Sequence, residues 1–156
     1  MRLKAGDIFE VYLSNNKKQF FQFVFKNMNE LGGEMIRAFD LEVNKEEIID
    51  VKTIISHPIK FYTHTMVGFG VKQSYWNRVG NVPIETDFVE PTFRGTDDVY
   101  SAVKKSNRWY LKTAGKVTQI GELKEEYKTL PKVGITPCHA VIKQLETGWD
   151  GFMVPE

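Results

Sequence analysis

Two alternating runs near the amino end constrain the fold of this chain most. In residues 19–26, phenylalanine occupies every second position from Phe21 to Phe25. A period of two is typical of a β-strand, because successive side chains point to opposite faces of a sheet. Residues 7–13 alternate in the same way, and residues 14–18 have the polar composition of a hairpin connection. The two runs therefore predict an antiparallel hairpin.

The next residues extend this hairpin and lead into less regular patterns. Residues 29–34 contain two glycines and predict a turn, after which residues 35–43 predict a third strand of an antiparallel meander. The other expected elements are a segment at 44–57 that fits neither period, one or two strands over 59–71 with a bend or bulge at Gly68 and Gly70, a proline-bearing loop at 87–98, a hairpin of 108–113 and 116–120, and a single short helix at 122–130.

One helix carries both a start and a stop signal. Thr136 is a good N-cap, Pro137 suits the first helical position and Gly148 suits a left-handed C-cap, so residues 137–147 are predicted to be helical. Together these patterns predict a mainly β (α+β) fold, an antiparallel curved sheet or small barrel with one helix near the C-terminus.

Length and composition limit the class of protein. A chain of 156 residues is the usual size of one domain, so residues 1–156 are expected to form a single domain. The formal net charge of +1 implies no bulk attraction to nucleic acid or to an anionic membrane. The single cysteine excludes an intrachain disulfide and a multi-cysteine zinc site. Without a long apolar run or a leader pattern, a cytoplasmic location is expected.

Residues 75–84 concentrate amino acids that are hard to replace. Trp76 can bury a large apolar surface, Gly80 tolerates a positive φ, and Pro83 fixes an extended backbone. We interpret this segment as a buried tryptophan followed by a tight backbone corner, with a structural role for all three residues.

The order of motifs along the chain resembles a known family. A Gly6-Asp7 turn leads into an alternating strand, an aromatic-rich strand follows, then W-N-R-V-G-N-V-P-I at residues 76–84 and P-T-F-R at residues 91–94. This order, over roughly the first 95 residues, resembles the immunity protein 26 family of bacterial toxin systems. The resemblance implies a non-enzymatic protein that binds and neutralises a cognate toxin. None of these motifs is catalytic.

An enzyme would have to use the single cysteine and the three histidines. Cys138 and His139 are adjacent, and neighbours in a helix point about 100° apart, so they do not form a nucleophile and base pair by themselves. His57 and His64 lack the spacing of a helical metal pair. No catalytic residue, metal site or cofactor is therefore expected. A hydrolase whose site is assembled from distant residues is the least favoured alternative.

Charge is segregated along the chain. Residues 40–50 and 85–98 are acidic, whereas residues 99–121 carry only basic charges. Exposed acidic loops would complement a basic partner such as a nuclease toxin, because opposite charge speeds association. The predicted partner-binding residues are Glu85, Asp87, Glu90, Asp97 and Asp98, with Glu46, Glu47 and Asp50 as a second set.

Two other interpretations of this charge pattern remain open. Charged runs are most often solvated faces without a partner. Alternatively, an exposed basic and aromatic strip would let a small β-barrel bind single-stranded nucleic acid by phosphate contacts and base stacking. The strip would consist of Lys104, Lys105, Arg108, Trp109 and Tyr110. The nearly neutral net charge makes nucleic acid the less favoured partner.

Overall fold

The computed structural model of the chain describes residues 2–99 and 102–151. The strands are β1 (Asp7–Tyr12), β2 (Lys17–Asn27), β3 (Gly33–Phe39), β4 (Val43–Asn44), β5 (Ile59–Thr65), β6 (Trp76–Asn81), β7 (Phe93–Thr96), β8 (Trp109–Thr113) and β9 (Lys116–Gly121). The helices are α1 (Val51–Ile55), α2 (Val67–Lys72) and α3 (Cys138–Thr147), and 3-10 turns occur at Met28–Glu30 and Glu125–Tyr127.

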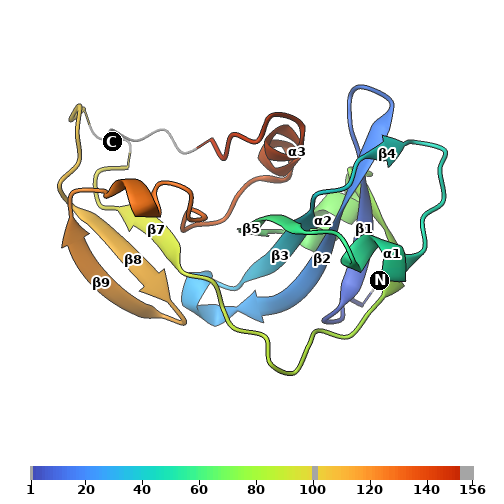
Figure 1. Cartoon of the computed structure of the whole chain (residues 1–156), viewed down its shortest axis with the longest axis horizontal. Coiled ribbons are helices and arrows are strands. Elements are labelled where there is room, and N and C mark those ends of the chain that lie inside the picture. The colour runs from blue at the N-terminus through green and yellow to red at the C-terminus, as the bar shows by residue number, and fades with distance from the viewer. Residues whose placement is uncertain (1, 100–101, 152–156) are drawn as a thin grey trace.

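Two antiparallel sheets form the framework of the molecule (Figure 1). The larger sheet has the order β5-β3-β2-β1-β6, with the short β4 paired to β2. The smaller sheet has the order β7-β8-β9. The predicted mainly β fold with a curved antiparallel sheet is confirmed. The larger sheet is open rather than closed into a barrel, with β5 and β6 as its two edges.

The first three predicted strands form the meander at the centre of the larger sheet. In β1 and β2, Phe9 pairs with Phe21, so the two alternating patterns face each other in register. The third strand is shorter than the predicted 35–43. β3 ends at Phe39, and residues 43–44 return as β4 against the start of β2.

One face of the larger sheet is covered by α2 and α3. The chain places α3 across this face (Figure 1), so residues from both ends of the sequence share one core. The buried members of this core are Phe9, Val11, Leu13, Phe21, Phe23, Ile36, Ala38, Val67, Trp76, Cys138, Val141 and Leu145. Their burial supplies the main hydrophobic stabilisation of the sheet.

Two smaller clusters complete the interior. On the other face of the sheet, Ile54 of α1 packs with Ile8, Phe20 and Phe39. Val24 and Met35 pack against Phe93 of β7 and so join the larger sheet to the smaller one.

The prediction of strands across residues 59–71 is only half right. β5 ends at Thr65, and α2 follows directly, so the expected bend at Gly68 and Gly70 is wrong. Gly70 is required for close packing. A Cβ atom there would lie 2.1 Å from the indole of Trp76, so only glycine lets α2 approach the tryptophan.

The expected corner after Trp76 is also absent at Gly80. Trp76 is fully buried, as predicted, but Gly80 lies within β6 and pairs with Ile8. A Cβ atom at Gly80 would lie 2.6 Å from Cγ1 of Val51. Glycine is needed because the start of α1 crosses the strand, and not because the backbone turns.

The structure confirms the helix near the C-terminus and corrects its start. α3 covers Cys138–Thr147 and ends at Gly148 with φ of 79°, the predicted left-handed cap. Pro137 rather than Thr136 occupies the N-cap position, because Thr136 is held elsewhere by a 2.7 Å hydrogen bond between its hydroxyl and that of Thr63. The β8–β9 hairpin is confirmed, whereas residues 122–130 contain a single 3-10 turn instead of a helix.

A candidate partner-binding site

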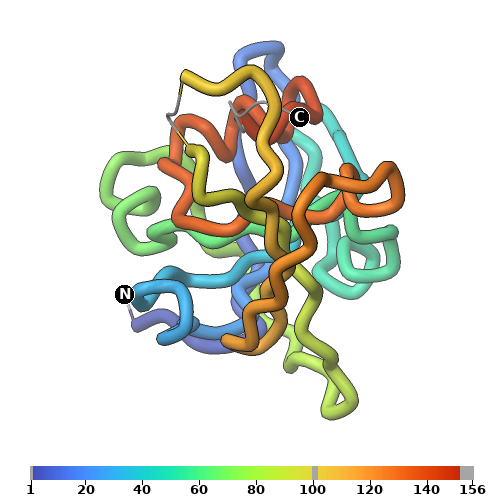
Figure 2. Tube along the Cα trace, turned by 90° about the vertical axis from the view of Figure 1, so that its left-hand side faces the viewer, coloured from blue at the N-terminus to red at the C-terminus, as the bar shows by residue number. Residues whose placement is uncertain are grey.

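The loop of residues 82–92 connects the two sheets and carries three of the predicted binding residues. It runs from the end of β6 to the start of β7 and extends from the body of the protein, at the lower edge of both views (Figures 1 and 2). Loops that project from a rigid sheet are common binding elements, because the scaffold fixes their position. The contacts between the first residues of the loop and the sheet therefore determine how the loop is held.

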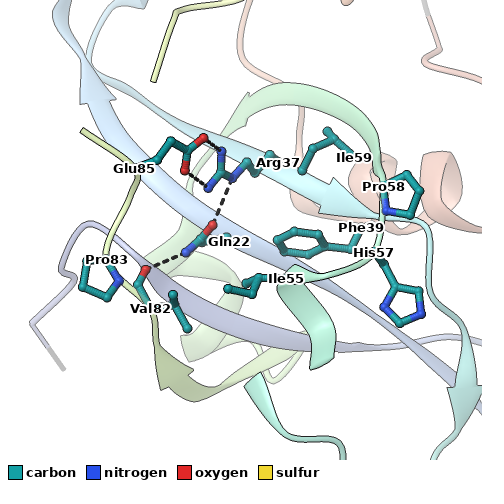
Figure 3. Close-up of a pocket in the computed structure, with 10 residues that line it drawn as sticks. All are labelled: Gln22, Arg37, Phe39, Ile55, His57, Pro58, Ile59, Val82, Pro83 and Glu85. Atoms are coloured by element: carbon teal, nitrogen blue, oxygen red, sulfur yellow. Dashed lines mark hydrogen bonds and ion pairs between the residues drawn. The ribbon is translucent and has the colours of Figure 1, made fainter. Parts of the chain in front are cut away.

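An arginine on the sheet anchors the loop (Figure 3). Both terminal nitrogens of Arg37 on β3 donate to the carboxylate of Glu85, at 2.7 and 2.8 Å. Arg37 Nε donates to Gln22 Oε1 at 2.9 Å, and Gln22 Nε2 donates to the carbonyl of Val82 at 2.7 Å. This network ties the first residues of the loop to two central strands. Bidentate pairs of this kind fix geometry as well as charge.

The network also sets the charge state of Glu85. The hydrogen bonds from Arg37 lower the pKa of Glu85 to about 2, and the same contact raises the pKa of Arg37. The Arg37 guanidinium lies 5.7 Å from the centre of the Phe88 ring, so it contacts the loop a second time. A cavity of about 440 Å³ lies beside the pair, between Pro83 and Ile59.

Beyond this anchor, the loop presents charge together with an apolar tip. Asp87 is exposed and Glu90 is half-buried. Val89, which lies between these two residues in the sequence, is 81% exposed. Neither Asp87 nor Glu90 has a hydrogen bond or ion pair within the described residues. The loop tip thus offers two carboxylates around an exposed valine.

Asp97 and Asp98 lie at the other end of β7 and differ from each other. Asp97 is exposed, and its carboxylate lies 3.6 Å from Arg108 Nη2. Asp98 is buried, accepts a 2.7 Å hydrogen bond from the Ser106 hydroxyl and pairs with Arg108 Nη1 at 3.2 Å. Asp98 therefore closes the loop after β7, and Asp97 is the carboxylate that faces solvent. The five predicted residues do not form one cluster.

The second acidic set lies on the connection from β4 to α1. Glu46, Glu47 and Asp50 are all exposed. Asp50 caps α1 by accepting from Lys52 N at 3.2 Å, and Glu47 accepts from Asn44 N at 3.2 Å. Two of the three thus stabilise their own connection.

The proposed basic and aromatic strip is divided by burial. Trp109 is 1% exposed, and Tyr110 packs across Gly95. Among the cations, Lys105 pairs with Glu122 at 3.5 Å and Arg108 with the two aspartates. In this structure Trp109 does not offer a free ring face for a base to stack on.

The cysteine and the three histidines that an enzyme would have to use differ in burial and in hydrogen bonding. Cys138 is buried, its thiol donates to the carbonyl of Met66 at 3.4 Å, and burial raises the pKa of the thiol. A raised pKa favours the unreactive thiol over the thiolate. His139 is exposed. His64 is buried, lies 3.0 Å from the Asn27 amide, and has its pKa lowered to about 4 by burial. His57 is half-buried, with its Nδ1 atom 2.9 Å from the carbonyl of Thr53.

Two kinds of feature are absent from the described residues. No group of three or more His, Cys, Asp or Glu side chains within residues 2–99 and 102–151 could hold a metal ion. In the same part of the chain, no helix has the length and apolar character needed to cross a membrane.

The sequence-based reasoning missed the anchor of the loop. Gln22 and Arg37 are polar residues in the middle of otherwise apolar strands, and they are paired across β2 and β3. A buried arginine needs a carboxylate partner, so its presence in a central strand was the available signal. The identity of the partner could not be read from the pattern, because Glu85 is 48 residues away.

Comparison with known families agrees with this scaffold. The model of the family described as Immunity protein 26 matches residues 4–107, more than half of the chain. The chain belongs to the immunity protein 26 family. The matched segment includes β1–β7 and all five predicted binding residues, while β8, β9 and α3 follow it. No curated protein and no solved structure gave a match.

Proposed function

We propose that this immunity protein 26 family member binds a cognate bacterial toxin and neutralises it by masking its working surface, without catalysis, in the cytoplasm. The observation that carries the proposal is the acidic loop of residues 82–92, held to the sheet by the Arg37–Glu85 pair within the segment matched by the family. A loop that is already ordered loses less conformational freedom on binding than a flexible tail.

The charge of the loop favours a basic partner. Asp87 and Glu90 lie on either side of the exposed Val89, so the loop tip combines carboxylates with an apolar contact. Toxins that act on nucleic acid need basic surfaces for phosphate, and carboxylates can occupy such a surface with charge-assisted hydrogen bonds. Asp97 contributes to the same acidic field from the other end of β7.

The test begins with the product of the gene immediately upstream, which is assayed for toxicity and then used as the binding partner. The double reversal Asp87→Lys with Glu90→Lys is expected to slow association by about tenfold at low salt, because steering by opposite charge is lost. The control is Lys104→Glu with Lys105→Glu, which changes the charge of two exposed lysines without touching the loop and should leave association unchanged or faster. Asp98 is unsuitable for reversal because it is buried.

Stopped-flow association rates and protection of cells that express the toxin give two readouts. If the lysine reversals abolish binding while the loop reversals have no effect, the binding surface lies elsewhere. If the purified protein processes the toxin or its substrate with turnover, the non-catalytic mechanism is wrong.

A further inference from the structure

Arg37 is a buried charge in the centre of the larger sheet. Gln22 pairs directly with Ile8 on one side and with Arg37 on the other, so the three side chains lie on one face. Ile8 belongs to the apolar core of that face, whereas Arg37 is 8% exposed and carries a charge. Replacement of a buried ion pair by apolar residues of similar volume is often neutral or stabilising. The stability of the sheet therefore does not account for an arginine at this position.

The guanidinium of Arg37 is directed at the loop of residues 82–92 (Figure 3). Its two terminal nitrogens donate to the carboxylate of Glu85 at 2.7 and 2.8 Å, and its central carbon lies 5.7 Å from the centre of the Phe88 ring. The third nitrogen, Nε, donates to Gln22 Oε1 at 2.9 Å. All three nitrogens thus have partners inside the protein, so Arg37 holds the loop from the side of the sheet.

The loop has few other polar contacts with the rest of the protein. At its start, the N–H of Val82 donates to the carbonyl of Gly6 at 3.1 Å. At its end, the hydroxyls of Thr92 and Thr113 lie 2.7 Å apart. Between these two points, the only hydrogen bonds from residues 83–91 to another segment of the described chain are those that Glu85 accepts. The central part of the loop is therefore fixed by the pair with Arg37.

The pair also fixes a turn that carries the exposed acidic residues. The N–H of Phe88 donates to the carbonyl of Glu85 at 3.1 Å, which closes a turn around Asp87. The Phe88 ring lies 6.5 Å from the ring of Tyr62, the residue that pairs with Arg37 across β3 and β5. Both ends of the turn thus rest on Arg37 or its neighbour, and the direction in which the turn projects depends on this contact.

From these contacts we infer that Arg37 is a positioning residue for toxin binding, which fixes the turn at Glu85 and Phe88 without contacting the toxin itself. The inference rests on the proposed function for the partner and for the contact surface. A loop that is fixed before binding loses less conformational freedom in the complex, so its affinity is higher. Arginine suits this role because its planar fork holds a carboxylate at two points, which a lysine cannot do.

The test replaces the charged pair by uncharged side chains. The double variant Arg37→Met with Glu85→Gln leaves no unpaired charge in the sheet, so it should unfold at a urea concentration close to that of the parent. The matched control is Lys18→Met with Glu10→Gln, which removes another 2.7 Å ion pair of the same sheet. The single variant Glu85→Gln changes only a half-exposed side chain and so provides a folded protein in any case.

Hydrogen exchange measures the order of the loop without the toxin. Exchange at the Phe88 amide should be about tenfold faster in the double variant, because the turn opens more often. Exchange at the Gly32 amide, which donates to the carbonyl of Asn27 in a different turn, should be unchanged. The dissociation constant for the upstream gene product should rise about tenfold in the double variant and stay unchanged in the control. Glu85→Gln should shift both quantities in the same direction by a smaller factor.

Two results would overturn the inference. One is an unchanged exchange rate at Phe88 in the double variant, since the loop would then be held without Arg37. The other is faster exchange with unchanged affinity, since the order of the loop would then have no part in binding. Failure of the proposed function is distinguishable, because the reversals Asp87→Lys and Glu90→Lys would then also leave association unaffected. If this inference alone fails, those reversals still slow association.

Discussion

Replacement of Trp76 by alanine tests the central packing of this fold. The indole is fully buried, and its N–H donates to the carbonyl of Val67 at 2.9 Å. The ring centres of Trp76 and Phe21 lie 5.1 Å apart in an edge-to-face arrangement. Truncation of a buried tryptophan costs about 3–5 kcal/mol. Loss of the donor to Val67 adds about 1 kcal/mol. We expect a total loss near 5 kcal/mol, a large part of the stability of a typical domain.

Urea unfolding followed by circular dichroism measures this loss. With a slope of about 2 kcal/mol per molar urea, the midpoint should fall by roughly 2.5 M. The control is Trp149→Ala, because Trp149 is half-exposed and its removal should change stability by no more than about 1 kcal/mol. If Trp76→Ala shifts the midpoint no further than Trp149→Ala, the tryptophan does not support the sheet and the reasoning is refuted.

Two further predictions concern a helix and a histidine. Gly70→Ala should destabilise the protein by about 1–3 kcal/mol, because the new Cβ would overlap the Trp76 indole. The control Gly68→Ala, whose Cβ meets nothing within 4 Å, should stabilise α2 slightly. Thermal melts in which both variants shift the melting temperature in the same direction would contradict this. His64 has a pKa of about 4 in the folded state against 6.5 for an ordinary histidine, so the unfolded chain binds the proton first as pH falls. The free energy of unfolding is therefore highest above pH 6.5 and decreases as pH falls toward 4. Urea titrations should show a free energy of unfolding about 2 kcal/mol lower at pH 4.5 than at pH 7, and His64→Gln should remove this difference. The same pH difference in the variant as in the parent protein would rule out the role of His64.

The parts of the fold that could be predicted are those governed by local patterns. Strands β1 and β2 repeat with a period of two, and α3 has a glycine stop signal, so each was found within a few residues. The errors lie where a distant contact decides the local conformation. α2 contains two glycines in six residues, which the local pattern disfavours in a helix. Glycine is needed at position 70 because the Trp76 ring fills the space that a side chain there would take.

The candidate site shows the same division. The acidic character of residues 85–98 is visible in the sequence, but the roles of the individual carboxylates depend on partners that are far away or buried. Glu85 is bound by Arg37 from β3, and Asp98 is bound by Ser106. Charge patterning alone treats these two residues and Asp87 as equivalent.

The position of α3 on the sheet affects how the chain folds during synthesis. Val141 and Leu145 cover a core whose other members begin at Phe9, so this contact joins residues separated by more than 130 positions. Contacts of such long range form slowly, and a nascent chain emerges at about 5–20 residues per second. The apolar face of the larger sheet therefore stays exposed on the ribosome until α3 has been made. We expect the growing chain to need chaperone protection during that interval.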